Sequence, residues 1–204
     1  MTLTGFLTYS AALALAAAVP GPGIVAMVAR GLGSGFRATL PMALGIGLGD
    51  LVYLTAAVMG LAFIAQTFGL VFMAFKYAGA AYLMYLAYIF WTAGVGINHV
   101  EARRAEGPLA AFASGLMVTL GNPKVMVFYL ALLPAIIDLS SVTLNDYVLL
   151  VTLTMAILMA VLLPYLALAT RTRALLQTPK ALKRISWVAA AFLGGAAIAI
   201  ATRA

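Results

Sequence analysis

Two charged side chains, Asp50 and Lys124, lie deep within long apolar stretches of the chain. On insertion scales a charge at the centre of a bilayer costs roughly 2.5–3.5 kcal/mol, so such a side chain is expected to face the protein interior. Burial also disfavours the ionised form of a carboxyl group. We therefore interpret Asp50 as a candidate proton-coupling residue. The alternative is that Asp50 lies closer to a membrane surface or makes a structural hydrogen bond.

Lys124 follows the helix-breaking pair Asn122-Pro123. Because proline has no N–H and interrupts helical hydrogen bonding, the helix that starts at Pro123 should present unpaired amides, which attract anions. The Lys124 ammonium would strengthen that anion site, and the side chain of Asn122 can both donate and accept hydrogen bonds. Alternatively, Lys124 extends along the helix to reach water.

A similar break occurs at Pro20-Gly21-Pro22-Gly23, and Lys76 is a further base in an apolar stretch. Ordinary proline kinks are the alternative explanation for both breaks. Lys76 fits a functional and a structural role equally well. An ion pair between Lys76 and Asp50 is a further alternative. The candidate solute-binding site comprises Pro20, Gly21, Pro22, Gly23, Asp50, Lys76, Asn122, Pro123 and Lys124.

The composition places these residues in a membrane protein. Of the 204 residues, 65% are hydrophobic and 8% are charged, whereas soluble domains have about 25% charged residues. The absence of cysteine excludes a disulfide scaffold, an iron–sulfur protein and a thiol nucleophile. With His99 as the single histidine, we expect no metal and no cofactor. The net charge of +7 does not indicate nucleic-acid binding, because the basic residues lie scattered at the ends of apolar runs.

The apolar stretches predict six membrane spans, since a bilayer core about 30 Å thick requires roughly 20 apolar residues per helix. None of these stretches alternates with period two, so each span is expected to be an α-helix. We therefore predict an all-α membrane protein with a single transmembrane domain over residues 1–204. The expected spans cover residues 3–29, 38–64, 68–94, 109–133, 147–170 and 185–202.

The basic residues indicate the orientation of these spans. Nine of the twelve Lys and Arg side chains follow spans one, three and five, whereas the loop after span four carries Asp138 and Asp146. Because positively charged loops stay in the cytoplasm, we predict that both termini lie outside. The basic stretch from Arg171 to Arg184 marks topology, with contact to anionic membrane lipid as a second role.

The two broken spans, one and four, suggest that the chain consists of two halves. Residues 1–98 form the first expected three-helix repeat and residues 109–204 the second, joined by a cytoplasmic loop at 99–108. Because three is odd, the second half enters the membrane from the opposite face, and the repeat is inverted. Interrupted segments at matching positions in inverted halves are typical of the central binding site of a transporter.

Three glycines of span two, Gly45, Gly47 and Gly49, superficially resemble a nucleotide-binding loop. No strand precedes them, which argues against that interpretation. Small residues let membrane helices approach closely, so we expect these glycines at a contact between helices.

Together the motifs resemble those of the lysine exporter (LysE/RhtB) family of amino-acid efflux proteins, over essentially the whole chain. The resemblance is carried by Pro20-Gly21-Pro22, the glycine-rich stretch from Arg30-Gly31 to Gly49-Asp50, the run 76–83, Asn122-Pro123-Lys124 with Phe128 and Pro134, and Pro179-Lys180. It implies a bacterial inner-membrane exporter of amino acids or their derivatives, with six spans, proton exchange and a homodimer. The chain departs from the family pattern at Gly23, where asparagine is common, and around Pro134, where Leu133 and Ile136 replace phenylalanine. These departures concern the identity of the solute.

We therefore predict a secondary transporter that exports a small zwitterionic solute, an amino acid. The half-helix starts near Pro22 and Pro123 would hold its carboxylate, with help from Lys124 and from Lys76. Asp50 and freed backbone carbonyls would hold its ammonium. The alternative is a channel or cation-efflux protein, although ion pathways usually contain rings or clusters of acids and the spans offer only Asp50. An enzyme is not expected, because no nucleophile with a base is evident.

Overall fold

The computed structural model describes residues 1–60, 107–172 and 179–202, together with Tyr77, Ala81, Met84, Tyr85, Ala87, Tyr88, Trp91 and Thr92. Every regular element within these residues is a helix, as the all-α prediction requires. The elements are α1 (Leu3–Ala18), α2 (Pro22–Ser34), α3 (Phe36–Val58), α7 (Pro108–Leu120), α8 (Pro123–Val127), a π-helix (Phe128–Leu132), α9 (Leu133–Ile136), a short 3₁₀ turn (Leu139–Ser141), α10 (Leu144–Thr172) and α11 (Pro179–Thr202).

Helices α3 and α10 are each long and apolar enough to cross a membrane alone. Two bent pairs also qualify: α1 with α2, at 54°, and α7 with the segment Pro123–Ile136, at 55°. The described residues therefore contain two to four candidate spans. Most of the predicted third span (68–94), including Lys76, and of the loop at 99–108 lies outside the described residues. The six-span inverted repeat thus stays a prediction.

Both predicted breaks are present. Helix α1 ends at Ala18 and α2 begins at Pro22, with Gly21 as the N-cap in an extended conformation. Helix α7 ends at Leu120, and α8 begins at Pro123. A proline suits the first position of a helix, where its missing N–H would have no helical partner anyway. Each break therefore follows from where the prolines stand in the sequence.

Two glycines correct the predicted ends of the first and second spans. The first span was expected to end at residue 29, but α2 continues to Ser34 and stops at Gly35, which has φ 86°. The second was expected to reach residue 64, but α3 ends at Val58, two residues before Gly60 with φ 73°. Glycine adopts these positive φ angles without steric cost. Each of these two helices therefore ends within two residues of a glycine with a positive φ angle.

Glycines also allow α3 and α7 to cross closely, as expected for the glycines of span two. A Cβ atom at Gly45 would lie 2.0 Å from the carbonyl oxygen of Phe112, and one at Gly115 would lie 2.1 Å from that of Met42. Gly49 packs against Thr119 in the same contact. These glycines serve helix packing.

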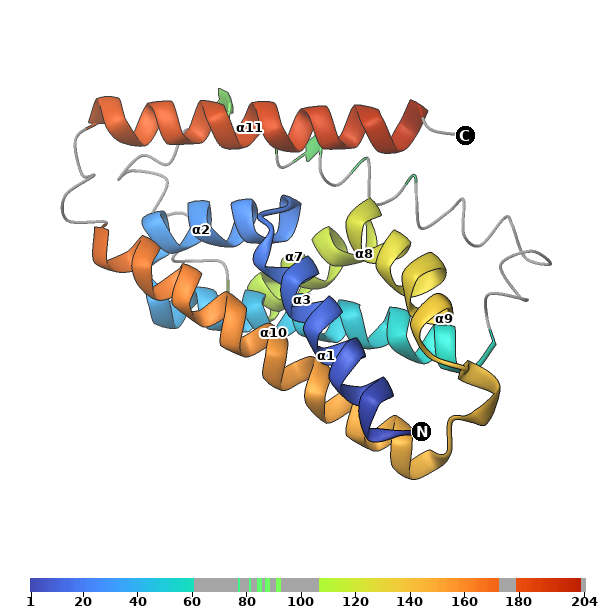
Figure 1. Cartoon of the computed structure of the whole chain (residues 1–204). Coiled ribbons are helices and arrows are strands. Elements are labelled where there is room, and N and C mark those ends of the chain that lie inside the picture. The colour runs from blue at the N-terminus through green and yellow to red at the C-terminus, as the bar shows by residue number, and fades with distance from the viewer. Residues whose placement is uncertain are drawn as a thin grey trace.

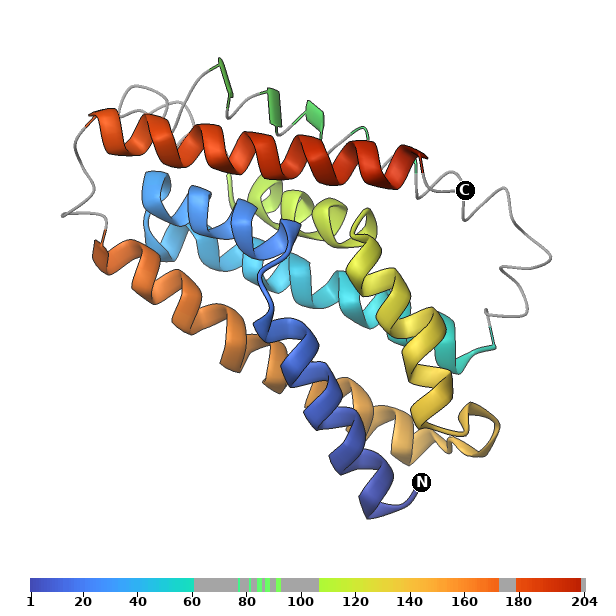
Figure 2. The ribbon, with the colours of Figure 1, turned by 45° about the horizontal axis from the view of Figure 1, so that its top comes forward.

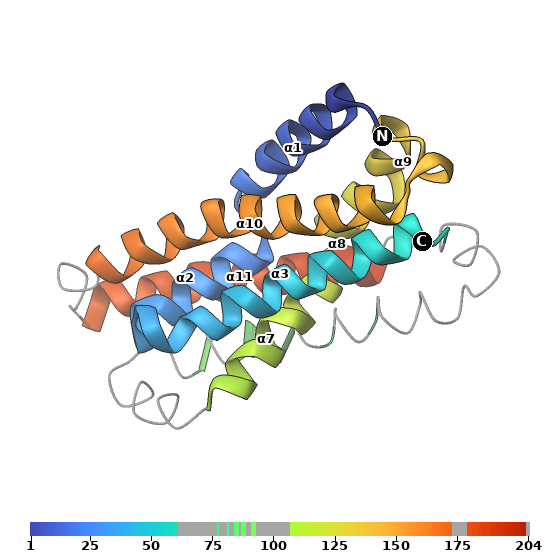
Figure 3. The ribbon, with the colours of Figure 1, turned by 90° about the horizontal axis from the view of Figure 1, so that it is seen from below.

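Helix α10 runs the length of the bundle in contact with α1, α2 and α3 (Figures 1 and 3). The N-terminal ammonium lies 2.9 Å from Asp146, which places the start of α1 beside the start of α10. Helix α11 lies along α2 (Figures 1 and 2). This arrangement brings the two broken helices and the two long helices together at the centre.

The buried apolar side chains form two clusters. One, here called the α2-side cluster, includes Ile24, Met27, Met42, Ile46, Leu158, Leu162 and Leu166. The other, the α1-side cluster, includes Tyr9, Leu13, Tyr53, Val125, Phe128, Tyr129 and Leu150. The polar residues of both breaks lie where the two clusters meet.

Candidate functional site

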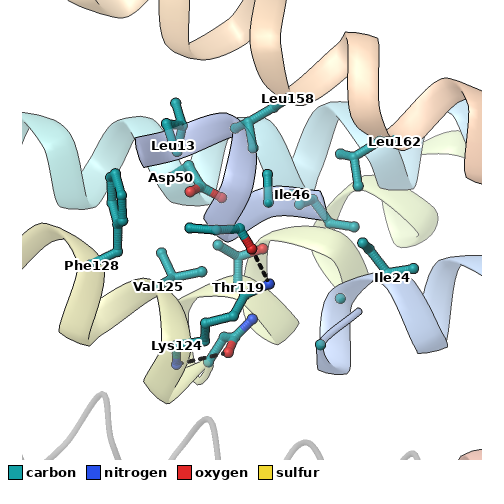
Figure 4. Close-up of a pocket in the computed structure, with 15 residues that line it drawn as sticks. Leu13, Ile24, Ile46, Asp50, Thr119, Lys124, Val125, Phe128, Leu158 and Leu162 are labelled. Atoms are coloured by element: carbon teal, nitrogen blue, oxygen red, sulfur yellow. Dashed lines mark hydrogen bonds between the residues drawn. The ribbon is translucent and has the colours of Figure 1, made fainter. Parts of the chain in front are cut away.

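A pocket lies where the two breaks meet, with a cavity of about 50 Å³. The start of α2 contributes Gly21, Gly23 and Ile24, and the second break contributes Asn122, Lys124 and Val125. The long helices contribute Ile46 and Asp50 from α3 and Leu158 and Leu162 from α10 (Figure 4). The pocket is therefore shared by elements from both halves of the chain.

Asp50 is 4% exposed, and its carboxyl group lines this pocket from α3. Lys124 lines the same pocket from α8, and within the described part of the chain no ion pair joins these two side chains. The Tyr129 hydroxyl lies beside the Asp50 carboxyl group, although their contact does not have hydrogen-bond geometry. A carboxyl group and an ammonium group thus face one small cavity without neutralising each other directly.

The Lys124 ammonium is bound to the end of α1. Its Nζ atom donates to the carbonyl oxygen of Ala16 at 2.9 Å (Figure 4). It also donates to the carbonyl oxygen of Val19 at 2.6 Å. The last carbonyls of a helix have no partner within that helix, and here a lysine from the other half of the chain supplies one. The carbonyls of Ala16 and Val19 therefore already accept hydrogen bonds within the protein, and the expectation that freed carbonyls hold the solute ammonium stays a prediction.

The start of α2, rather than that of α8, carries unpaired amides. In α8 the Asn122 side chain accepts a hydrogen bond from the backbone N–H of Lys124 at 3.1 Å. In α2 the N-cap Gly21 has no side chain with which to cap the helix. The Lys124 ammonium lies against Gly21, since a Cβ atom there would be 3.4 Å from Nζ. The strongest positive potential in the pocket therefore combines the α2 start with Lys124.

Thr119, at the end of α7, was not predicted from the sequence. Its side chain lines the pocket and is 1% exposed, and its hydroxyl oxygen has no hydrogen-bond partner among the residues that the structure describes. A buried hydroxyl without a partner is costly. It is therefore available to a bound solute or water. Its position three residues before Asn122 is the only sequence signal that could have indicated it.

Several tyrosines around the pocket were also missed. The Tyr9 hydroxyl hydrogen-bonds the Thr154 hydroxyl at 2.5 Å. Tyr53 donates to the carbonyl oxygen of Leu120, and Tyr165 donates to that of Ala18 at 2.9 Å. Tyrosines in apolar stretches are commonly interfacial anchors, so composition alone gives no reason to place them at the centre of the bundle.

Of the predicted site residues, the structure brings Gly21, Gly23, Asp50, Asn122 and Lys124 into one pocket. Pro22 and Pro123 begin the two helices behind it, whereas Pro20 is exposed on the turn between α1 and α2. Lys76 lies outside the described residues. The functional role of each of these residues stays a prediction.

Two broken helices meet at a largely apolar pocket that contains unpaired amides and a carboxyl group. This arrangement is typical of helical membrane transporters with a central binding site. The chain belongs to the LysE type translocator family, whose profile matches residues 14–204.

Named relatives span most of the chain. A homoserine/homoserine lactone efflux protein of Salmonella typhimurium is 28% identical over 186 residues, which cover 91% of this chain and 90% of the relative. A leucine efflux protein of Enterobacter sp. is 31% identical over 137 residues, covering 67% of this chain and 65% of the relative. An uncharacterized membrane protein of Synechocystis sp. is 30% identical, covering 72% and 71% respectively. The comparison with solved structures gives no match.

Proposed function

We propose that this chain is an inner-membrane secondary transporter. It exports amino acids with uncharged side chains, or their derivatives, in exchange for protons. The observation that carries the proposal is the pocket, in which Asp50 and Lys124 face one cavity at the meeting point of two broken helices. A zwitterion presents one carboxylate and one ammonium a few ångströms apart, and the pocket offers one partner for each.

The carboxylate of the solute binds at the start of α2. Backbone N–H groups of Gly23 and Ile24 point from that helix start, and Lys124 adds a positive charge beside them. The side-chain amide nitrogen of Asn122 also lies near this point, because a Cβ atom at Gly21 would be 3.8 Å from it. Charge-assisted hydrogen bonds of this kind are about twice as strong as neutral ones.

The ammonium of the solute binds to Asp50, with the Thr119 hydroxyl as a second acceptor. Because the α1 carbonyls of Ala16 and Val19 are occupied by Lys124, Asp50 is the principal acceptor. When the ammonium leaves, a proton replaces it on the carboxyl group, since an unpaired charge at this depth is costly. This replacement couples export to proton entry.

The side chain of the solute is uncharged. The remaining pocket wall is apolar, with Ile24, Ile46, Leu158 and Leu162 among its residues. A basic solute side chain would need a second acid, and an acidic one would need a second base, which the described pocket residues do not provide. The relatives whose names specify homoserine and leucine are consistent with this choice.

The test is efflux of labelled leucine, homoserine, lysine and glutamate from proteoliposomes. We expect saturable release of leucine and homoserine, acceleration by the same solute outside, and little release of lysine or glutamate. Lys124→Met should reduce release at least tenfold, because one charge-assisted contact is worth about 1.5–3 kcal/mol. Lys183→Met, an exposed lysine on α11, is the matched control. Flux without such exchange would favour the channel, and equal flux of all four solutes would contradict the assigned pocket.

A further inference from the structure

Two tyrosines stand at matching positions beside the pocket on the two long helices. On α3, the pocket residues Ile46 and Asp50 are followed three residues later by Tyr53. On α10, the pocket residues Leu158 and Leu162 are followed three residues later by Tyr165. The spacing of two lining residues and one tyrosine is the same in both helices.

The two tyrosines also make the same kind of bond, in a reciprocal arrangement. Tyr53 donates to the carbonyl oxygen of Leu120, the last residue of α7. Tyr165 donates at 2.9 Å to the carbonyl oxygen of Ala18, the last residue of α1. Each broken helix is therefore capped at its exposed carbonyl end by a long helix from the other half of the chain.

The two caps lie on opposite sides of the pocket. Tyr53 belongs to the α1-side cluster, and Tyr165 packs against the α2-side cluster. The hydrogen bond of 2.7 Å between Thr55 and Tyr147 places the end of α3 beside the start of α10, so the two helices are antiparallel. Tyr53, one helical turn beyond the pocket on α3, therefore lies toward one membrane face. Tyr165, one turn beyond the pocket on α10, lies toward the opposite face.

We propose that Tyr53 and Tyr165 are paired latches that close the pocket toward opposite membrane faces, and that transport proceeds by opening one latch at a time. This inference rests on the proposed transport function. Neither tyrosine lines the pocket, so both act as positioning residues by holding a broken helix end in place. With both bonds formed, the pocket holds a cavity of about 50 Å³, room for about four water molecules. In this structure both tyrosine bonds are formed.

The free energy of each of these two hydrogen bonds is small enough for the bond to open and close during transport. The net contribution of one hydrogen bond to stability is modest, because water replaces the lost partner when the bond opens. Loss of one hydroxyl therefore shifts the equilibrium between the closed and open states of the pocket on one side by about twofold to tenfold. The aromatic ring stays packed. A tyrosine-to-phenylalanine change removes the latch and preserves its shape.

The chain contains no cysteine, so a single introduced thiol reports access to the pocket. We would place it at Ala17, which lines the pocket on α1, and measure its rate of modification by a membrane-impermeant thiol reagent in vesicles of each orientation. Tyr53→Phe should raise the rate about twofold to tenfold from the face at which α3 ends, the predicted outside. Tyr165→Phe should raise it to a similar extent from the opposite face.

Tyr147→Phe is the matched control, because it removes a tyrosine hydrogen bond between α10 and α3 that caps no broken helix. It should leave both rates unchanged. Equal increases from both faces in either latch variant, or no increase in both, would overturn the proposal. The modification needs no solute, so side-specific rates in a protein that exports no amino acid would retain the latches and reject the proposed solute.

Discussion

At the scale of single residues, the polar groups of the pocket differ in whether they have hydrogen-bond partners. Lys124 is held by two carbonyls, whereas the buried hydroxyl of Thr119 has no partner within the described part of the chain. Buried polar groups of native proteins are nearly always paired. The unpaired hydroxyl therefore indicates a position that a solute or water completes.

Thr119→Val tests that indication, because valine keeps the shape and removes the hydroxyl. Removing a buried group that has no partner costs no hydrogen bond, so the melting temperature in detergent should not fall, while the half-saturating solute concentration should rise severalfold. Thr39→Val is the control: Thr39 is fully buried and donates to the Gly35 carbonyl at 2.9 Å, and its loss should lower stability by about 1 kcal/mol. Unchanged solute affinity in Thr119→Val would remove Thr119 from the site.

The sequence predicts which residues form the pocket better than it predicts the hydrogen bonds that these residues make. Asp50, Asn122 and Lys124 are identifiable because polar groups at membrane depth are rare and prolines interrupt helices. The partners of Lys124 are carbonyls of Ala16 and Val19, more than a hundred residues away. Which helix end faces a given side chain depends on how helices pack, and nothing local in the sequence encodes that.

At the scale of elements, the contact between α3 and α7 depends on backbone proximity. A methyl group at Gly45 would lie 2.0 Å from a carbonyl oxygen of the facing helix, a backbone atom that cannot rotate away. Gly115 makes the reciprocal contact with the backbone of Met42. The close crossing holds Asp50 of α3 near Thr119 of α7, so this contact positions two groups of the pocket.

Gly45→Ala should therefore destabilise the bundle by more than the 1–3 kcal/mol typical of an overpacked core, with a lower melting temperature in detergent and loss of the monodisperse peak in size-exclusion chromatography. Gly195→Ala on α11 is the control, because a Cβ atom there meets no atom within 4 Å. It should leave the melting temperature within a few degrees. Equal stability of the two variants would contradict the close crossing.

Helix ends show what a hydropathy pattern does and does not predict. The breaks at Pro22 and Pro123 were predictable, since a missing N–H acts within one turn. The ends of α2 and α3 were not. Helix α2 continues past Arg30, the charge before which the first span was expected to end, as far as Ser34, and α3 ends at Val58 although apolar residues follow Gly60 in the sequence. The tyrosine caps were equally invisible, as their acceptors lie on other helices.

At the scale of the whole molecule, the predicted orientation assigns each helix start to one membrane face. The ion pair between the N-terminal ammonium and Asp146 places the starts of α1 and α10 together, on the face predicted to lie outside. The start of α7 follows a loop predicted to be cytoplasmic. Leu3, Leu144 and Leu109 are at these starts and are 75%, 77% and 79% exposed.

Single cysteines at these three leucines test the orientation, because the chain has no other thiol. In intact cells an impermeant thiol reagent should label Leu3→Cys and Leu144→Cys, whereas Leu109→Cys should react only after the membrane is permeabilised. The reverse pattern would place both termini in the cytoplasm. Labelling of Leu3→Cys and Leu144→Cys from different faces would contradict the arrangement of α1 and α10.

The most direct test of the central claim, that Asp50 exchanges solute for proton, is leucine release from loaded proteoliposomes with and without external acidification, for wild type and Asp50→Asn. The account predicts that an inward proton gradient accelerates release by the wild type. Asp50→Asn cannot alternate between charged and neutral forms, so its release should be slow and should not respond to the gradient. An equal acceleration in Asp50→Asn would contradict the account and place proton coupling elsewhere in the chain.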